Sequence, residues 1–187
     1  VRETRIGIRS VEITPAGVFI NGKTRFLRGV NRHQEYSYVG YALSPNAHYR
    51  DAKLIKEAGF DYVRLSHYPQ SPHFMRAADE LGIVLLTSIL GWQFYNNDPA
   101  FSEHVIQTCR DLVRRDRNHP SVIAWECGLN ETEMPLTLIE GLQQLGARLL
   151  IRTASLLSKA LVLHRIPVME FQTAPDSRKK SGHLFFY

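Results

Sequence analysis

The chain has 187 residues, which suits one domain with a sizeable core or a piece of a larger domain. Its hydrophobic content of 44% and charged content of 22% predict a soluble globular protein, and no run approaches the roughly 18 apolar residues of a membrane span. The net charge of +5 would suit a nucleic-acid binder, but the excess lies in residues 146–187 and not on the main body. That segment holds Arg148, Arg152, Lys159, Arg165, Arg178, Lys179 and Lys180 against Glu170 and Asp176.

The first elements are predicted to be β-strands. Residues 6–13 alternate between apolar and polar side chains and are rich in β-branched residues, which favours a strand. Asn21 and Gly22 form a typical hairpin turn between two short strands. We therefore expect the opening of the chain to be a hairpin that leads into a domain.

From residue 25 the pattern changes to alternating strands and helices. Short apolar segments predict strands, and longer segments with helical spacing predict helices, two of which begin at Ser-Pro pairs and end at glycine. The predicted strands are 25–30, 61–65, 83–86 and 121–125, and the predicted helices are 45–58, 72–81 and 99–115.

Such alternation implies a parallel sheet covered by helices. A (β/α)₈ barrel and an open doubly wound sheet both satisfy it. No glycine-rich phosphate loop follows any strand, which weakens the second arrangement. Polar clusters do follow the strands, and in a barrel they would converge on one rim, where active sites lie.

The last of these clusters, Asn130-Glu131, is a candidate proton donor. A carboxyl group at a barrel mouth can be kept protonated by partial desolvation and can then donate to a glycosidic oxygen. The amide of Asn130 could bind an adjacent sugar hydroxyl. The same residues would also suit the first turn of a helix, so the pair alone is a weak signal. Glu126 is expected to face outward.

Other polar and aromatic residues after the strands are candidates for substrate binding. His33 and His67 occupy equivalent positions in successive units and could bind sugar hydroxyls, or each could be a structural group. Arg64 could orient a carboxylate or form an ion pair inside the barrel. Trp92 offers a flat aromatic face for a sugar ring, or it packs within its loop.

Two cysteines are too few for a disulfide framework. Cys109 and Cys127 are predicted to be buried free thiols. The sequence has no CxxC pair or His/Cys cluster, so it predicts no metal site and no cofactor.

Several of these segments resemble glycoside hydrolase family 2, the β-galactosidase and β-glucuronidase family. Residues 28–33 (RGVNRH) resemble its first-strand motif, and residues 63–69 (VRLSHYP) its second-strand motif. Residues 115–125 (RDRNHPSVIAW), followed by Asn130-Glu131, resemble its acid/base signature. Residues 6–9 (IGIR) resemble the link from a preceding β-sandwich domain. The motifs occur in the family's order over residues 5–135.

The resemblance implies a retaining exo-β-glycosidase on a partial (β/α)₈ TIM barrel of about four βα units. Glu131 would be the general acid/base, Asn130, His33 and His67 would bind the sugar, and Arg64 would support the site. Residues 31–33 (NRH) are more similar to the β-galactosidase form of the first-strand motif than to the β-glucuronidase form, which favours β-galactosides as substrates. The domains would be 1–24, the end of a β-sandwich with its linking hairpin; 25–145, the partial barrel; and 146–187, an atypical basic tail.

The sequence departs from the family at two places with chemical consequences. The family's magnesium ligands after the third strand have no match in residues 86–93, so the resemblance implies no metal site in this chain. Retention also needs a second carboxylate, which the family places after its seventh strand. Glu170 is only 39 residues beyond Glu131, too few for three more βα units of roughly 30 residues each. The nucleophile is therefore predicted to be absent, and the tail suggests a truncated or frame-shifted product.

An alternative remains a non-catalytic sugar-binding remnant or complementing fragment. A third reading is a nucleic-acid binder that uses the basic tail. The expected partner is a β-galactoside or related β-glycoside, with no nucleic acid and no membrane, and the parent enzyme would be cytoplasmic or periplasmic. Open barrel edges predict low stability or self-association.

Overall fold

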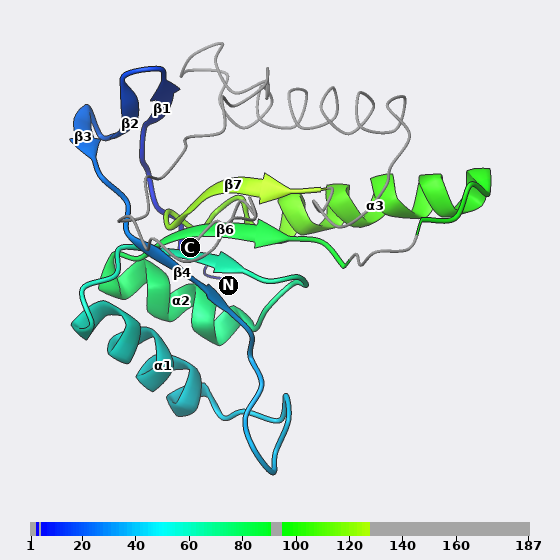
Figure 1. The fold of residues 1–187 in the computed structure, drawn as a ribbon, viewed down its shortest axis with the longest axis horizontal. Helices are drawn as coiled ribbons and strands as arrows, with labels where there is room; N and C mark the ends of the chain where they lie inside the picture. The colour runs from blue at the N-terminus through cyan, green and yellow to red at the C-terminus, as the bar shows by residue number, and fades with distance from the viewer. Residues whose placement is uncertain (1–2, 4, 91–94, 128–187) are drawn as a thin grey trace, which may run out of the picture.

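The computed structural model describes residues 3, 5–90 and 95–127, and Figure 1 shows its ribbon. The predictions for Trp92, Asn130, Glu131 and the basic tail lie outside these residues. Two sheets and three helices make up the described part. No helix in the described part is long and apolar enough to cross a lipid bilayer.

The smaller sheet is the predicted opening hairpin, extended by one strand. It consists of β1 (Val11–Thr14), β2 (Gly17–Ile20) and β3 (Lys23–Arg25), paired antiparallel in chain order. Asn21 and Gly22 connect β2 to β3 with φ of 52° and 72°, the positive values that a tight hairpin turn needs. The Asn-Gly turn is thus confirmed, but the predicted strand over 6–13 is wrong for its first five residues.

The larger sheet is parallel, with β4 (Gly29–Arg32), β5 (Tyr62–Leu65), β6 (Val84–Ser88) and β7 (Val122–Glu126) in that spatial order. Each new strand is added on the same side, as in a barrel. A doubly wound sheet would reverse its order partway. The sheet is therefore four consecutive strands of a partial barrel, which confirms the predicted fold class.

Three helices connect the strands, as predicted: α1 (Pro45–Glu57), α2 (Pro72–Leu81) and α3 (Pro99–Asp116). Each has proline in its first turn, and a side-chain oxygen of the preceding residue accepts a backbone N–H there. These capping residues are Ser44, Ser71 and Asp98. Gly82 ends α2 at φ 67°, a left-handed conformation that suits glycine.

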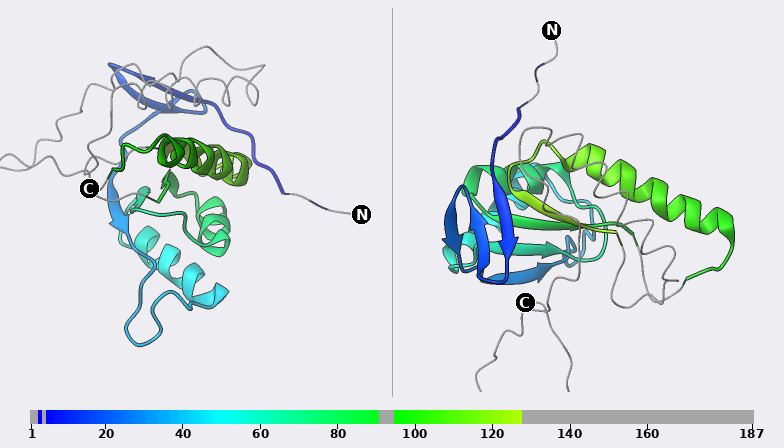
Figure 2. Two further views of the ribbon diagram at one scale, coloured as in Figure 1. Left: turned by 90° about the vertical axis from the view of Figure 1, so that its right-hand side faces the viewer. Right: turned by 90° about the horizontal axis from the view of Figure 1, so that it is seen from above.

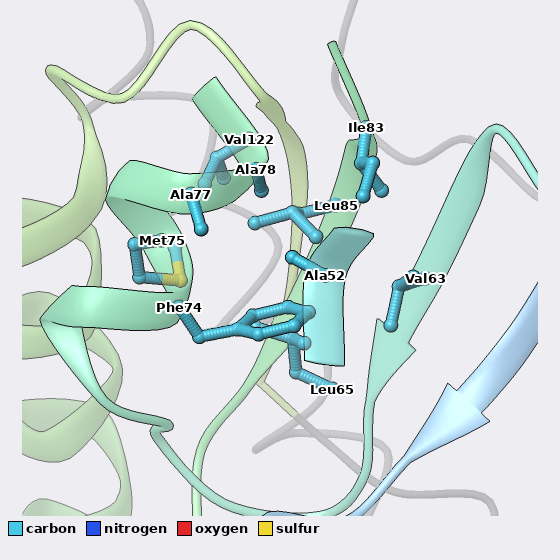
Figure 3. Packing of buried hydrophobic residues seen from close by; sticks show 10 residues of the cluster. All are labelled: Ala52, Val63, Leu65, Phe74, Met75, Ala77, Ala78, Ile83, Leu85 and Val122. Atoms are coloured by element: carbon cyan, nitrogen blue, oxygen red, sulfur yellow. The ribbon is translucent and has the colours of Figure 1, made fainter. Parts of the chain in front are cut away.

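The main core lies between the sheet and helices α1 and α2, which lie side by side on its outer face (Figures 1 and 2). Figure 3 shows the ring of Phe74 directed from α2 toward Leu65 and Ala52. Val63 and Leu65 of β5 point into this core. By the alternation of a strand, Tyr62 and Arg64 point to the opposite face, the inside of the barrel.

A second, smaller cluster lies where α3 packs on the end of the sheet. It contains the buried Ile89, Cys109 and Leu112, with Trp125 and Cys127 packed against them. Cys109 and Cys127 form a disulfide, with Cα atoms 5.5 Å apart. The prediction of two free thiols is therefore wrong, because α3 brings its cysteine beside the residue that follows β7.

The segment before β1 crosses back to the start of β7. Gly7 donates its N–H to the carbonyl of Asn118 at 3.3 Å, and the Arg9 guanidinium donates to the carbonyl of Val122. A Cβ at position 7 would collide with the ring of Pro120. Glycine at this position therefore lets residues 5–9 lie directly on the α3–β7 connection.

Candidate active site

The candidate site lies at the carboxyl ends of β4 to β7. The four strands run in one direction, so their ends and the loops that follow meet at one edge of the sheet (Figure 1). His33 follows β4, His67 follows β5, and Cys127 follows β7. Glu131 comes four residues after Cys127 in the sequence and lies outside the described residues.

His33 and His67 are brought together as predicted. Their ring centroids are 6.1 Å apart with an edge-to-face orientation. His33 is exposed and His67 is half-buried. Tyr68 lies 5.8 Å from His33 and Tyr41 lies 5.5 Å from Tyr68, both between ring centroids. The rim thus presents imidazole and phenol groups in one patch, a mixture of donors and flat faces that suits a polyhydroxylated ligand.

The two histidine loops are held by direct hydrogen bonds between them. The backbone N–H of Gln34 donates to the Tyr68 hydroxyl at 3.0 Å, and the backbone N–H of Ser71 donates to the Gln34 side-chain oxygen at 2.8 Å. Burial raises the pKa of Tyr68, so its hydroxyl stays protonated. The Ser66–His67 peptide bond is cis.

Beneath this patch, Arg64 forms a buried ion pair inside the barrel. Its Nη2 lies 2.6 Å from Glu126 Oε1, and its Nε lies 3.2 Å from Oε2. The Ser88 hydroxyl donates to Oε2 at 2.5 Å. Side chains from β5 and β6 therefore converge on a single carboxylate of β7, and these hydrogen bonds link the three strands. Burial, followed by the negative charge of Glu126, raises the pKa of the neighbouring Tyr62.

This arrangement corrects the expectation for Glu126, which faces inward and not outward. The register shifts between Leu85 and Leu86, so that Leu85 pairs with Val122 but Leu86 pairs with Ala124. The extra residue in β7 reverses the side-chain alternation beyond it and turns Glu126 to the face of Arg64. Of the two alternatives for Arg64, the structure shows the interior ion pair.

A second buried cation, Arg32, anchors the first histidine loop from the helix side of the sheet. Its Nε donates to Asp51 of α1 at 2.6 Å, Nη1 donates to Gln70, and the guanidinium lies 3.9 Å above the ring of Phe74. Tyr36, in the loop after His33, donates to the same Asp51 at 2.9 Å. The residue immediately before His33 is thus fixed by a charged hydrogen-bond network.

The sequence analysis missed Asp51 and Gln70 as supports of the site, because neither stands in a recognisable motif, and it assigned Glu126 to the wrong face of the sheet. The sequence feature that could have indicated these residues is a carboxylate or amide at a helix or strand position whose spacing predicts burial. Within residues 3, 5–90 and 95–127, no three His, Cys, Asp or Glu side chains are grouped to hold a metal ion.

The chain is similar to known glycosidases over most of the described region. Residues 11–149 match the family model described as "Glycosyl hydrolases family 2, TIM barrel domain". A β-galactosidase of Thermoanaerobacterium thermosulfurigenes is 41% identical over 132 residues, which cover 70% of this chain and 18% of that protein. A β-galactosidase of Thermoanaerobacter pseudethanolicus is 40% identical over 130 residues, covering 68% of this chain and 17% of that protein.

The fold agrees with a solved structure of the same kind. The FMN-binding β-glucuronidase of Facaelibacterium prausnitzii L2-6 superposes with a TM-score of 0.73 at 35% identity, covering 77% of this chain and 23% of that one. The chain spans less than a quarter of the length of each of these relatives. With a parallel sheet in barrel order, paired rim histidines and a family match over residues 11–149, the chain belongs to glycosyl hydrolase family 2 and carries part of its TIM-barrel domain.

Proposed function

We propose that this chain carries the proton-donating part of the active site of a retaining exo-β-glycosidase that acts on β-galactosides or related β-glycosides. The observation that carries the proposal is the pairing of His33 and His67 at the rim, 6.1 Å apart, above the Arg64–Glu126 ion pair. Paired imidazoles can bind adjacent sugar hydroxyls. The ion pair beneath them fixes the strands from which the site is built.

In this proposal Glu131 is the general acid/base and Asn130 binds a hydroxyl next to the scissile bond. The Glu131 carboxyl gives its proton to the glycosidic oxygen as the bond from that oxygen to the anomeric carbon breaks. As a carboxylate, it then removes a proton from the water that releases the sugar. Trp92, which follows β6 in the sequence, would stack on the sugar ring.

Retention needs a second carboxylate about 5–5.5 Å from the acid/base. Glu126 is a poor candidate, because both of its oxygens are engaged by Arg64 and Ser88. Only Glu133, Glu140 and Glu170 follow Glu131 among the glutamates of these 187 residues. We infer that the nucleophile is supplied from outside them. The chain by itself would then bind a sugar without turning it over.

Two measurements test the proposal. The chain alone is assayed with chromogenic β-galactoside and β-glucuronide, and its affinity for galactose and for glucuronate is measured by titration calorimetry. We expect no turnover, weak binding that favours galactose, and a loss of about tenfold in affinity for His33→Ala or His67→Ala, each of which removes one hydrogen bond to the sugar. His104→Ala is the matched control, because His104 is exposed on α3.

Robust turnover that Glu131→Gln abolishes would refute the external nucleophile while supporting the acid/base assignment. Equal binding by the wild type and both histidine variants would refute the assignment of the rim as the sugar site. The complementing-fragment alternative predicts turnover only after addition of a chain that carries the later barrel strands.

A further inference from the structure

We propose that the Cys109–Cys127 disulfide links the end of β7 covalently to helix α3 and can be reduced reversibly. The stability of this part of the sheet would then depend on the redox state of the two cysteines. The inference concerns a site of covalent modification and does not depend on the proposed glycosidase function. It rests on the position of the two cysteines, the packing of α3 and the place of β7 in the sheet.

The two cysteines are placed for a bond. Their Cα atoms are 5.5 Å apart, within the usual range for disulfides. Cys109 is completely buried between Ile89 and Leu112, and Cys127 packs against the same cluster. The bond therefore lies against an apolar cluster, where Cys109 is shielded from reagents in solution and Cys127 is half-buried.

The bond is the outermost buried anchor of α3. Side chains of the first half of this helix, residues 99–108, are exposed or half-buried, and the fully buried ones begin at Cys109 and continue with Leu112, Val113 and Asp116. Figures 1 and 2 show the first half of α3 extending beyond the sheet. Without the bond, α3 would be held to the sheet by the buried side chains of its last two turns and by Val105 and Ile106, which are only partly buried against the same cluster.

The other cysteine of the disulfide, Cys127, directly follows β7, whose pairing with β6 is irregular. Among the described strands, β7 has a hydrogen-bonded neighbour on one side only, β6, and a bulge interrupts that pairing. The bulge disrupts the ladder at this point, so local opening of the β6–β7 pairing is easier there. Cys127 directly follows Glu126, so the bond to α3 also fixes the carboxylate that Arg64 and Ser88 share.

The chemistry balances with a small-molecule disulfide as the oxidant. One cysteine thiolate attacks oxidised glutathione and releases one glutathione thiol, and the second cysteine then displaces the other to close the protein disulfide. Two thiols of the protein lose two electrons, and one glutathione disulfide becomes two thiols. Dithiothreitol reverses the exchange. Because Cys109 is fully buried, attack on its sulfur in the folded protein requires local opening and is slow.

The first experiment maps the bond. The full chain is equilibrated with oxidised glutathione, free thiols are blocked with iodoacetamide, and tryptic peptides are analysed without reduction. The expected product is a single linked pair, residues 77–110 joined to residues 118–148. Two alkylated cysteines, or two glutathione adducts with no linked pair, would overturn the proposal.

The second experiment measures what the bond does. Reduction of the wild type is expected to lower the melting temperature by about 5–10 °C, the scale expected for a loop of 18 residues in a chain of this size. Backbone amides of residues 122–127 are expected to exchange at least about tenfold faster. The Cys109→Ala/Cys127→Ala variant should resemble the reduced wild type and should not respond to dithiothreitol.

The comparison of oxidised with reduced wild type needs no substitution, so it decides the question even if the double variant does not fold. Identical melting temperatures and exchange rates for the two forms would overturn the proposal, as would an equal response of the double variant to the reductant.

Discussion

Arg64 of β5 and Glu126 of β7 meet across the intervening strand β6, with Nη2 2.6 Å from Oε1. The exposed fractions of their side chains are 8% and 16%, so both charges lie inside the barrel face and not in solvent. A buried pair gains little net stability over apolar residues, but the loss of one partner leaves an uncompensated charge. The pair therefore fixes which strands can lie on either side of β6.

We predict that Arg64→Met lowers the free energy of unfolding by about 3 kcal/mol, because Glu126 is then buried without its cation. Arg64→Met/Glu126→Met should recover part of that loss. The midpoints of urea denaturation at pH 7 measure both. Lys53→Met is the control, because its ion pair with Glu57 is exposed and should contribute almost nothing. A double variant less stable than Arg64→Met would contradict this account.

Arg32→Lys is predicted to cost about 2–4 kcal/mol, although the charge is retained. A lysine ammonium cannot reach Asp51 and Gln70 at once or lie flat on Phe74, as the guanidinium does. Arg28→Lys, four residues earlier and exposed, should change stability by less than about 0.5 kcal/mol. Chemical denaturation of the two variants side by side tests this, and equal effects would show that the geometry of the guanidinium is unimportant.

His48 is predicted to make the α1 side of the core sensitive to mild acid. Burial, followed by the positive charge of Arg32, lowers the pKa of His48 below 6.5. His73 also disfavours its protonation, while Asp51 favours it. A lowered histidine pKa means that the unfolded chain binds the proton more readily, so stability is complete above pH 6.5 and falls as the pH drops below it.

The melting temperature should therefore fall between pH 7 and pH 5 in the wild type and fall less in His48→Gln. The matched control is His104→Gln, which removes an exposed histidine. If the control flattens the pH profile as much as His48→Gln does, burial of His48 is not the cause.

Asp79 of α2 is predicted to stabilise the start of β7 down to acid pH. Burial alone would raise its pKa, but hydrogen bonds from His119 and Ser121 outweigh burial, and the pKa falls below 3.8. A lowered carboxyl pKa contributes stability that is complete above the unfolded value and is lost as the pH falls below about 3.8 toward the folded value. Asp79→Asn should cost about 1–3 kcal/mol at neutral pH and remove this acid transition.

Denaturant midpoints from pH 6 to pH 2.5 measure the effect. Asp111→Asn is a suitable control, because the Asp111 ion pair on α3 is exposed. A parallel loss of stability with acid in Asp79→Asn and the wild type would exclude Asp79 as its source.

Local chemistry explains how much of the fold was predictable. Ser44 and Ser71 before proline, and Gly82 after α2, act within a few residues, so the helices lie where the sequence places them. Strand starts were less certain: the strand predicted at 25 begins at Gly29, where a Cβ would lie 2.8 Å from the carbonyl oxygen of Tyr62. That contact comes from another part of the chain and has no local signal.

The candidate site was predictable where equivalent positions repeat. His33 and His67 follow consecutive strands, and parallel strands bring such positions together. Glu126 was misplaced because one bulge in β7 reverses the alternation on which the expectation depended. The disulfide was not predicted, because two cysteines 18 residues apart come close only when α3 packs against the end of β7.

The contact of residues 5–9 with the start of β7 has a consequence for synthesis of the protein. Arg9 and Val122 are 113 residues apart, so at roughly 5–20 residues per second the ribosome delivers the second partner about 6–23 s after the first. During that interval residues 7–9 lack the α3–β7 connection on which they lie, although Arg5 can pair with Glu80 as soon as α2 has formed. Nascent chains on one messenger RNA would then expose the same unfilled sheet edge to one another, and a chaperone that binds extended apolar segments would have its longest access to the protein at this stage.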